Sequence, residues 1–539
     1  MRPVLLIVIT SLLLCAATFI KGEDVLVTIE QGTLQGTVLT SVYNTSYTAF
    51  LGIPYAEPPV GDLRFQPPLA ASGWDGVRDA TQYGSDCVQA TGSGSEDCLY
   101  LNVYVPGVPG EGAGLPVIVW VHGGAFVNGS GSNVTSGPDF LVSYGVILVT
   151  INYRLGPLGF LSTGDSAALG NAGLKDQRLA LEWVQRNIAS FGGDPQRVTL
   201  QGQSAGAGAA SLHLVASPGL FSQAIIESGT FASSMTIERN PRYHAFKLGA
   251  VLGFETEDSQ QLVDFLRSVN ATDLLVDKSL LSTDEEKLYI SFLIWAPTIE
   301  PQVNGSLLSE SPITALKEGR FSHVPIMIGG TSAENGINIL SRPDVISNLN
   351  EVFEEVVGPC LHLPTSMQQA EAALKLREFY FGNNTISLDD PEPLVHLTQD
   401  VSFFDATDAV VRTIVETADI PVYYYEFDYR GDSIPTNEWG VNHGGELRLL
   451  FLRNDTKYNL DPTSEEDEVR RTLLRLWTNF ANYGNPTPEG DPVTWEPYNP
   501  RNRSYLLMRA NFSLEENFLG ERMDFWNTNI PLMPYPGTY

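Results

Sequence analysis

Basic residues are scarce in this chain. Of its 539 residues only 32 are lysine or arginine, against 63 aspartates and glutamates, so the formal net charge is −31 at pH 7. A surface with so few cations repels the phosphate backbone of nucleic acids and the headgroups of anionic lipids. We therefore expect no nucleic-acid partner and no electrostatic attachment to a membrane.

Long apolar runs are missing as well, except at the N-terminus. Residues 1–22 combine a basic start at Arg2 with a short apolar core, which is typical of a secretory signal peptide. No later stretch reaches the roughly 20 apolar residues of a membrane-spanning helix. Internal repeats and low-complexity linkers are also lacking, so the sequence predicts a secreted, extracellular protein with a single domain over residues 23–539.

Cysteine is rare, with four residues in the whole chain. Cys15 lies in the predicted signal peptide and would be removed with it. Cys87 and Cys98 enclose a short segment rich in glycine, serine and threonine, and in an oxidising compartment we expect them to form a disulfide. Cys360 then remains, either as a buried thiol or as the site of an intermolecular bridge.

Nine Asn-x-Ser/Thr sequons fit an extracellular route. Asn128 lies close to a glycine-rich loop described below and is the weakest candidate. The other eight are the predicted glycosylation sites: Asn44, Asn133, Asn270, Asn304, Asn383, Asn454, Asn502 and Asn511.

The strongest chemical signal is the segment Gly202-Gln203-Ser204-Ala205-Gly206. A β-prone stretch, Val198–Gln201, precedes it, and small residues that can start a helix follow it. A strand, a sharp Gly-x-Ser-x-Gly turn and a helix form the nucleophile elbow of α/β-hydrolases, which exposes the serine hydroxyl at the edge of a sheet. The alternative is a glycine-serine turn that matches this short pattern by chance.

A second glycine-rich turn makes chance less plausible. The apolar run Leu115–Val121 has the length of a strand and stops at His122-Gly123-Gly124-Ala125. In α/β-hydrolases such a loop directs backbone N–H groups at the developing oxyanion. The chain therefore has two separate features of an α/β-hydrolase active site, the predicted oxyanion loop and, after it, the predicted nucleophile elbow.

A serine needs an oriented base, and in this fold the base is a histidine that follows the acid in the chain. Of the seven histidines, His443 lies in a loop flanked by glycines that could carry an imidazole over the sheet edge. His362 and His396 lie in ordinary mixtures of polar and apolar residues. His443 is therefore the predicted base.

The orienting acid is less clear from the residues alone. Residues 324–328 have the pattern of a strand, and Glu334 follows shortly after its predicted end. A carboxylate just past a strand end is where this architecture places the acid, which favours Glu334. Asp400 and Asp405 stay open as alternatives.

Several ordered blocks of the chain resemble the type-B carboxylesterase and cholinesterase family. They cover nearly the whole of residues 23–539, from Phe50–Pro59 to Phe525-Trp526. The most specific block is Glu96-Asp97-Cys98-Leu99-Tyr100-Leu101-Asn102-Val103. The resemblance implies an α/β-hydrolase fold, with a mostly parallel central sheet and helices on both faces.

The resemblance also assigns roles to residues of this chain. It implies a catalytic triad of Ser204, Glu334 and His443, and an oxyanion hole made by the backbone N–H groups of Gly124, Ala125 and Ala205. Many relatives have a glycine where Ala125 stands, a change that keeps the N–H group. The family further implies the Cys87–Cys98 disulfide and an ion pair between Arg64 and Glu96. Neither a metal nor a cofactor is needed for this chemistry.

Two departures from the cholinesterases favour small neutral esters as substrates. The loop between Cys87 and Cys98 is short and lacks the aromatic residue that binds a quaternary ammonium group by cation–π attraction. The residue before the serine is the neutral Gln203, where those enzymes typically have glutamate.

Three functions remain open within the family. The predicted function is that of a secreted serine carboxylesterase with an acyl-serine intermediate. Gly-Gln-Ser-Ala-Gly is also typical of insect juvenile hormone esterases, so juvenile hormone, or a pheromone or odorant ester, is an alternative substrate. A non-catalytic binding or adhesion protein is the alternative of another class, although such members usually lack a triad residue. The sequence does not indicate an oligomeric state.

Overall fold

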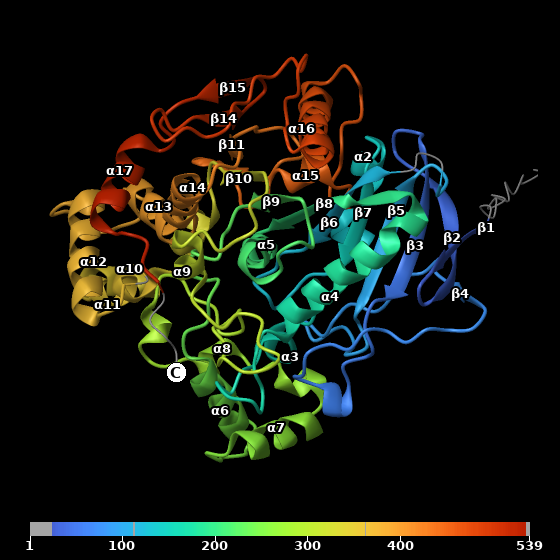
Figure 1. The fold of residues 1–539 in the computed structure, drawn as a ribbon. Coiled ribbons are helices and arrows are strands. Elements are labelled where there is room, and N and C mark those ends of the chain that lie inside the picture. Colours follow the sequence, from blue (N-terminus) through green and yellow to red (C-terminus); the bar gives the residue numbers. More distant parts are fainter. Residues whose placement is uncertain (1–23, 111–113, 362, 535–539) are drawn as a thin grey trace, which may run out of the picture.

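The computed structural model describes residues 24–110, 114–361 and 363–534 (Figure 1). The predicted signal peptide and His362 lie outside the described residues. A 13-stranded sheet runs through the molecule in the order β1-β2-β3-β5-β7-β6-β8-β9-β10-β11-β14-β15, and β4 pairs with β2. The strands are β1 Asp24–Ile29, β2 Gly32–Thr40, β3 Ser46–Pro54, β4 Val77–Asp79, β5 Tyr100–Pro106, β6 Leu115–Val121, β7 Ile147–Ile151, β8 Gly193–Gln203, β9 Gln223–Glu227, β10 Ile326–Thr331, β11 Val422–Phe427, β14 Tyr505–Met508 and β15 Phe512–Glu515, with a separate pair β12 Thr436–Asn437 and β13 Gly440–Val441.

The centre of the sheet is parallel and its margins are antiparallel. Strands β7, β6, β8, β9, β10, β11 and β14 pair in parallel, whereas β1, β2, β3, β5 and β15 add antiparallel neighbours. Along β6, Val117 and Val119 pack into one hydrophobic cluster, and Ile118 and Trp120 pack into another. Successive side chains of a strand point to opposite faces, so both faces of the central sheet are buried. The predicted fold class is therefore confirmed.

Helices cover both faces of this sheet (Figure 1). Helices α4 and α5 contribute Leu181, Trp183 and Leu212 to the first cluster, while α16 contributes Leu473 and Trp477 to the second. The helices are α1 Asn133–Ser136, α2 Asp139–Val142, α3 Gly156–Phe160, α4 Ala172–Asn187, α5 Ala205–Ala216, α6 Pro241–Val251, α7 Ser259–Ser268, α8 Lys278–Leu281, α9 Pro312–Lys317, α10 Pro343–Glu351, α11 Phe353–Val357, α12 Ser366–Phe381, α13 Glu392–Gln399, α14 Asp405–Thr417, α15 Leu447–Leu450, α16 Glu465–Tyr483 and α17 Gly520–Asn529.

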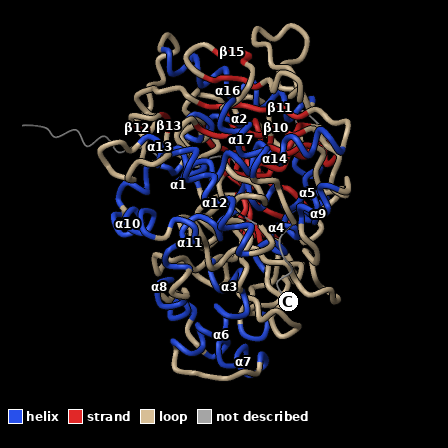
Figure 2. Tube along the Cα trace, turned by 90° about the vertical axis from the view of Figure 1, so that its left-hand side faces the viewer, coloured by secondary structure: helices blue, strands red, loops and turns tan. Residues whose placement is uncertain are grey.

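Two long connections leave the carboxyl ends of the central strands. Residues 228–325 join β9 to β10 and carry α6 to α9, and residues 332–421 join β10 to β11 and carry α10 to α14. In Figure 1 the helices α6, α7 and α8 lie at the bottom of the molecule, and α10 to α13 lie at its left. Figure 2 shows α6 and α7 well away from the strands, which are drawn in red. Both connections therefore build structure around the sheet without entering it.

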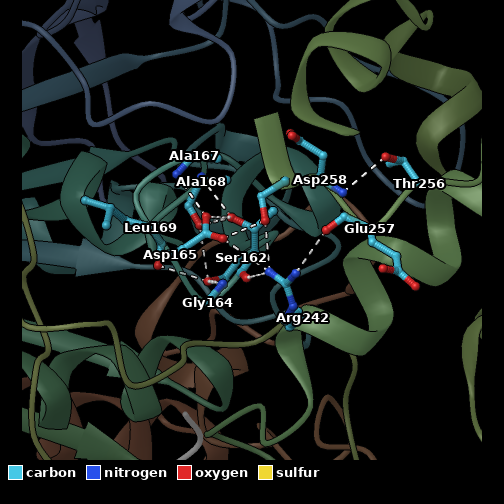
Figure 3. Close-up of polar contacts among 12 residues, drawn as sticks. Ser162, Gly164, Asp165, Ala167, Ala168, Leu169, Arg242, Thr256, Glu257 and Asp258 are labelled. Carbon is cyan, nitrogen blue, oxygen red and sulfur yellow. Dashed lines mark hydrogen bonds and ion pairs between the residues drawn. The ribbon is translucent and has the colours of Figure 1, made fainter. Parts of the chain in front are cut away.

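A polar cluster ties α6 and α7 to the loop at residues 162–169 (Figure 3). Arg242, on α6, donates to the carbonyl oxygen of Thr163 at 2.8 Å, to Ser259 Oγ at 2.9 Å and to Asp165 Oδ2 at 3.2 Å. Asp165 also accepts hydrogen bonds from Thr163 Oγ1, at 2.7 Å, and from the backbone N–H of Ala167, at 3.0 Å. One guanidinium group thus joins a loop to two helices.

The predicted strand at residues 324–328 has different bounds in the structure. Strand β10 begins after Pro325 and continues through Gly329 and Gly330 to Thr331. The prediction ended the strand at the glycines because glycine usually interrupts strands. Here Gly329 pairs with Tyr425 of β11, and a Cβ atom on Gly329 would lie 2.3 Å from the Tyr425 carbonyl oxygen. The glycine therefore permits a close backbone approach and the ladder continues.

Within the described ranges, no helix is both long enough and apolar enough to cross a membrane.

Candidate active site

Ser204 occupies a strained turn between β8 and α5. Its backbone angles are φ 59° and ψ −125°, a region that residues other than glycine rarely adopt. A Cβ atom on Gly202 would lie 2.2 Å from the Gly206 carbonyl oxygen, and one on Gly206 would lie 2.1 Å from the Val121 carbonyl oxygen. Glycine is thus required on both sides of the serine. The backbone N–H of Ser204 donates to the Glu227 carbonyl oxygen at 2.8 Å, which fixes the turn to β9.

The loop after β6 comes close to this serine. Gly124, Ala125 and Phe126 all have positive φ, at 111°, 55° and 59°. A Cβ atom on Gly123 would lie 3.0 Å from the Ser204 Cβ atom. Among the described residues, the backbone N–H groups of Gly124 and Ala125 donate to no protein acceptor. The loop therefore leaves two donors unused next to the serine.

His122 supports this loop through its ring and its backbone carbonyl group. Its ring stacks on Tyr153, with the ring centroids 4.4 Å apart, and the Tyr153 hydroxyl donates to the His122 carbonyl oxygen at 2.8 Å. Burial lowers the pKa of His122 to about 4. The imidazole is therefore neutral at pH 7 and acts as a packing group.

Glu334 and His443 are in direct contact. A carboxylate oxygen of Glu334 and Nδ1 of His443 form a short hydrogen bond, and Glu334 is completely buried. The other carboxylate oxygen accepts a hydrogen bond from the Thr331 backbone N–H at 2.9 Å. The alternative acid Asp400 is instead bound by Arg522 and Tyr380.

Backbone contacts hold the loop of His443 against the end of β10. The Ala333 N–H donates to the Val441 carbonyl oxygen at 3.0 Å, and the Val441 N–H donates to Ser332 Oγ at 2.9 Å. The Phe403 ring packs on the His443 imidazole, with the centroids 5.0 Å apart. The backbone contacts thus hold the loop at the end of β10, and the Phe403 ring packs directly on the imidazole.

Phe403 belongs to a π-helical turn, Asp400–Phe404, between α13 and α14. Such turns are rare and occur frequently at functional sites. No feature of the sequence indicated this turn or the contact that it makes. His396, which the sequence did not favour as the base, lies one element earlier, on α13.

Gln203 contacts the other nitrogen of the same imidazole. Its side-chain Nε2 lies 3.1 Å from His443 Nε2. Among the described residues, the Ser204 hydroxyl makes no hydrogen bond of its own. The structure thus brings Glu334 and His443 together, with Gln203, the chain neighbour of Ser204, on the nitrogen that faces away from Glu334.

Two buried carboxyl groups that sequence reasoning missed lie behind this site. Glu227 ends β9 and accepts hydrogen bonds from Trp477 Nε1 at 2.8 Å and from Gln201 Nε2 at 3.2 Å. Burial raises the pKa of Glu227 to about 8. Burial, together with the charges of Glu227 and Glu334, raises the pKa of Glu446 well above its usual range. Burial thus disfavours negative charge on both acids, which limits the charge that accumulates beside Glu334.

The predicted structural contacts of the N-terminal half are present. Cys87 and Cys98 form a disulfide. Arg64 donates to both carboxylate oxygens of Glu96, at 2.7 Å and 2.6 Å. Cys360 is buried, and its thiol donates to the Ser291 carbonyl oxygen at 3.2 Å. Of the two states expected for Cys360, the structure has the buried thiol.

Most of the predicted glycosylation sites are exposed. Asn502 is half-buried and its side-chain amide donates to Glu516 at 2.9 Å. Asn128 is half-buried too, and its side-chain oxygen is shielded from solvent. The exposed sites are Asn44, Asn133, Asn270, Asn304, Asn383, Asn454 and Asn511.

In the part of the chain that the structure describes, no three His, Cys, Asp or Glu side chains are grouped as metal ligands. A cavity of about 600 Å³ opens between the loop at residues 234–240 and the helices α11 and α12. Its lining contains none of Ser204, Glu334 and His443, so we do not assign it to the reacting ester.

Comparison with known proteins places these features in context. The chain matches the family described as the carboxylesterase family over residues 23–526. It is 35% identical to juvenile hormone esterase of Tribolium castaneum, over 98% of this chain and 97% of that protein. It is 32% identical to a carboxylic ester hydrolase of Bombus ignitus, over 92% of each chain. The crystal structure of juvenile hormone esterase from Manduca sexta, with OTFP covalently attached, matches with a TM-score of 0.83 and 30% identity, covering 94% of this chain and 99% of that one.

Proposed function

This chain belongs to the carboxylesterase family, whose relatives named above are ester hydrolases, and on that premise we propose that it hydrolyses neutral carboxylic esters through an acyl intermediate on Ser204. The observation that carries this proposal is the elbow. Ser204 is held in its strained turn at the end of β8, and its chain neighbour Gln203 contacts the imidazole to which Glu334 bonds.

The proposed first step is acylation of the serine. Glu334 bonds to Nδ1 of His443, so Nδ1 carries the proton and the lone pair of Nε2 is free to act as a base. Nε2 removes the proton of Ser204 Oγ as this oxygen attacks the ester carbonyl. The imidazolium then protonates the alcohol, which leaves.

The second step is deacylation. Water loses a proton to His443 Nε2 and attacks the acyl carbonyl, which releases the acid and restores the Ser204 hydroxyl. In both steps the carbonyl oxygen gains negative charge, and the backbone N–H groups of Gly124, Ala125 and Ala205 are the proposed donors to it. Removing one such donor costs roughly 3 kcal/mol of transition-state stabilisation in other serine hydrolases.

Juvenile hormone is a second candidate substrate. Two relatives, at 35% and 30% identity, are named juvenile hormone esterases, and the neutral Gln203 precedes the serine as in that group. The disulfide loop from Cys87 to Cys98 carries no aromatic side chain for a cationic alcohol. These features support a neutral ester and do not separate juvenile hormone from other neutral esters.

We further propose that the protein is secreted as a single domain after loss of residues 1–22. The disulfide, formed in oxidising compartments, and the seven exposed sequons support this route. N-terminal sequencing of protein recovered from the medium of insect cells expressing the full chain should begin at Glu23. Protein that stays in the cells with Met1 retained would contradict secretion.

The experiment that tests the reaction is hydrolysis of p-nitrophenyl esters from acetate to octanoate, with the juvenile hormone methyl ester as a further substrate. We expect Ser204→Ala to lower kcat/KM by at least about 1,000-fold on every ester, because the nucleophile is removed. Ser279→Ala, on an exposed serine of α8, is the matched control and should equal the wild type.

An organophosphate locates the nucleophile independently. Mass spectrometry of the treated protein should find the phosphoryl adduct on the peptide that contains Ser204 and nowhere else. A folded wild-type protein that is no faster than Ser204→Ala on any ester would overturn the proposed reaction. A higher kcat/KM for juvenile hormone than for every p-nitrophenyl ester would favour the second candidate substrate.

A further inference from the structure

Gln203 fills the space between the two loops that meet at Ser204. It is the last residue of β8 and is only 6% exposed. A Cβ atom on Gly123 would lie 3.0 Å from its Oε1 atom, and a Cβ atom on Gly444 would lie 3.0 Å from its Nε2 atom. The amide is thus enclosed between the loop after β6 and the loop of His443, and it can bond to the imidazole without leaving this position.

The contact with His443 has a defined chemistry. Glu334 accepts a hydrogen bond from Nδ1–H, so the proton of the neutral ring is on Nδ1 and a lone pair is left on Nε2. The amide nitrogen of Gln203 carries two protons and no lone pair for bonding, so at 3.1 Å it donates to this lone pair. Ser204 must use the same lone pair in order to lose its proton. In the resting site, therefore, the Gln203 amide occupies the lone pair of His443 that Ser204 needs.

We propose that Gln203 is a positioning residue for the catalytic imidazole, holding Nε2 of His443 through its amide in the resting site and leaving that nitrogen to Ser204 when an ester binds. This inference rests on the function proposed above. A glutamine can serve both protonation states of the imidazole, since its nitrogen donates to the neutral ring and its oxygen accepts from the charged ring. A carboxylate would pair with the charged ring alone, and an apolar side chain with neither.

The surrounding groups explain why a neutral side chain belongs at this position. Glu334 contacts the imidazole from the end of β10. Glu446, which precedes α15, and Tyr425, on β11, lie close enough to Glu334 and to Glu227 of β9 for their charges to interact. Burial raises the pKa of Glu227, Glu446 and Tyr425 and so disfavours the charged form of each. Among the described residues, Glu334 is the acid that bonds to the imidazole, and a carboxylate at position 203 would add a second.

The pH dependence of the reaction tests the proposal. In Gln203→Glu the added carboxylate stabilises the imidazolium, so the acidic limb of the kcat/KM profile on p-nitrophenyl acetate should move to higher pH by at least about one unit. In Gln203→Met, which has a similar length and no hydrogen bond, kcat should fall about tenfold with KM within about twofold. The acidic limb should then stay near that of the wild type.

Gln185→Met is the matched control. Gln185 is a half-buried glutamine on α4 whose amide donates to the carbonyl oxygens of Pro195 and Leu220, at 2.9 Å and 3.0 Å, so it has no contact with the site. The pH profile of kcat/KM and the kcat of Gln185→Met should match those of the wild type. Circular dichroism and thermal unfolding should show that all three variants are folded. Wild-type kcat and an unmoved acidic limb in both Gln203 variants would overturn the proposal.

A measurement without turnover separates this inference from the proposed function. The proton shared by His443 Nδ1 and Glu334 should give a downfield resonance in proton NMR spectra of Ser204→Ala. Gln203→Glu in that background should move the titration of this resonance to higher pH. An unmoved titration would refute the role of Gln203, whereas a wild-type protein without esterase activity would refute the function alone.

Discussion

The geometry around Ser204 depends on two residues that have no side chain. Replacing Gly206 by alanine would put a methyl group 2.1 Å from the Val121 carbonyl oxygen, so the elbow or β6 must move. A displacement of about 1 Å at a reacting group costs about 100-fold in rate. We expect Gly206→Ala to lower kcat/KM on p-nitrophenyl acetate by at least about 100-fold.

The control for this substitution is Gly358→Ala, because a Cβ atom there would meet no atom closer than 3.3 Å. It should keep wild-type kcat/KM and unfold within a few degrees of the wild type. Equal activity of Gly206→Ala and Gly358→Ala would show that the elbow tolerates the added methyl group.

A second prediction at the residue scale concerns Glu227 and pH. Its pKa is raised to about 8 in the folded protein, against about 4.3 for an unperturbed glutamate. Between these values the folded state binds more protons than the unfolded state, so the free energy of unfolding falls as pH rises. A neutral glutamine at this position would not have this dependence. We therefore expect Glu227→Gln to gain stability relative to the wild type as pH increases from 5 to 8.

Urea unfolding at several pH values measures this difference. The slope for one such group is at most about 1.4 kcal/mol per pH unit. Glu255→Gln serves as the control, since Glu255 is exposed to solvent. A constant difference between Glu227→Gln and the wild type across this range would contradict the raised pKa of Glu227.

The sequence alone identified those residues whose role is indicated by a local sequence pattern. The glycines around Ser204 and the loop at Gly124 are recognisable because a tight turn permits few residue types. Glu227 and the Gln203–His443 contact were missed. Each becomes meaningful only when strands distant in the sequence lie side by side, and a lone glutamate or glutamine in a sequence looks like an ordinary polar residue.

At the scale of elements, the connections between strands depend on a few polar contacts. Arg242 joins α6 to the loop at residues 162–169 and to Ser259, the first residue of α7 (Figure 3). Its side chain is 51% exposed, so we expect Arg242→Ala to lower the free energy of unfolding by only about 1 kcal/mol. Hydrogen exchange should nevertheless become faster in α6 and α7 than elsewhere.

Arg242→Lys should restore little of this protection, because a lysine cannot reproduce the fork of donors. Arg186→Ala removes an exposed arginine that pairs with Glu30 at 3.4 Å, and it should leave exchange in α6 and α7 unchanged. Uniform acceleration over the whole chain in Arg242→Ala would contradict a local role.

The sequence predicted the bounds of an element well where the hydrophobic pattern and the turn-forming residues at its ends indicate the same bounds. The predicted strand at residues 115–121 coincides with β6. The end of β10 was missed because Gly329 and Gly330 continue the ladder, and the π-helical turn at Asp400–Phe404 has no sequence signature. In both places, packing against the rest of the fold determines the backbone conformation more than the intrinsic conformational preferences of the local residues do.

At the scale of the whole molecule, the charge of −31 makes stability depend on salt. Like charges repel one another most strongly in the compact state, and added salt screens this repulsion. We expect the Tm at pH 7 to rise by about 1–3 °C between about 10 mM and 150 mM sodium chloride. Near pH 4.5, the isoelectric point, the same change should have much less effect. An equal rise at both pH values would point to a cause other than net charge.

The arrangement of the site also sets when activity can arise during synthesis. Gln203 and His443 are 240 residues apart in the chain, and the strands β11 and β14 that complete the parallel sheet flank this histidine on either side in sequence. At about 5–20 residues per second, a ribosome needs roughly 12–48 s to travel from Ser204 to His443. If the proposed mechanism holds, a nascent chain carries Ser204 without its base over this interval, and it acquires hydrolytic capacity only as translation nears completion.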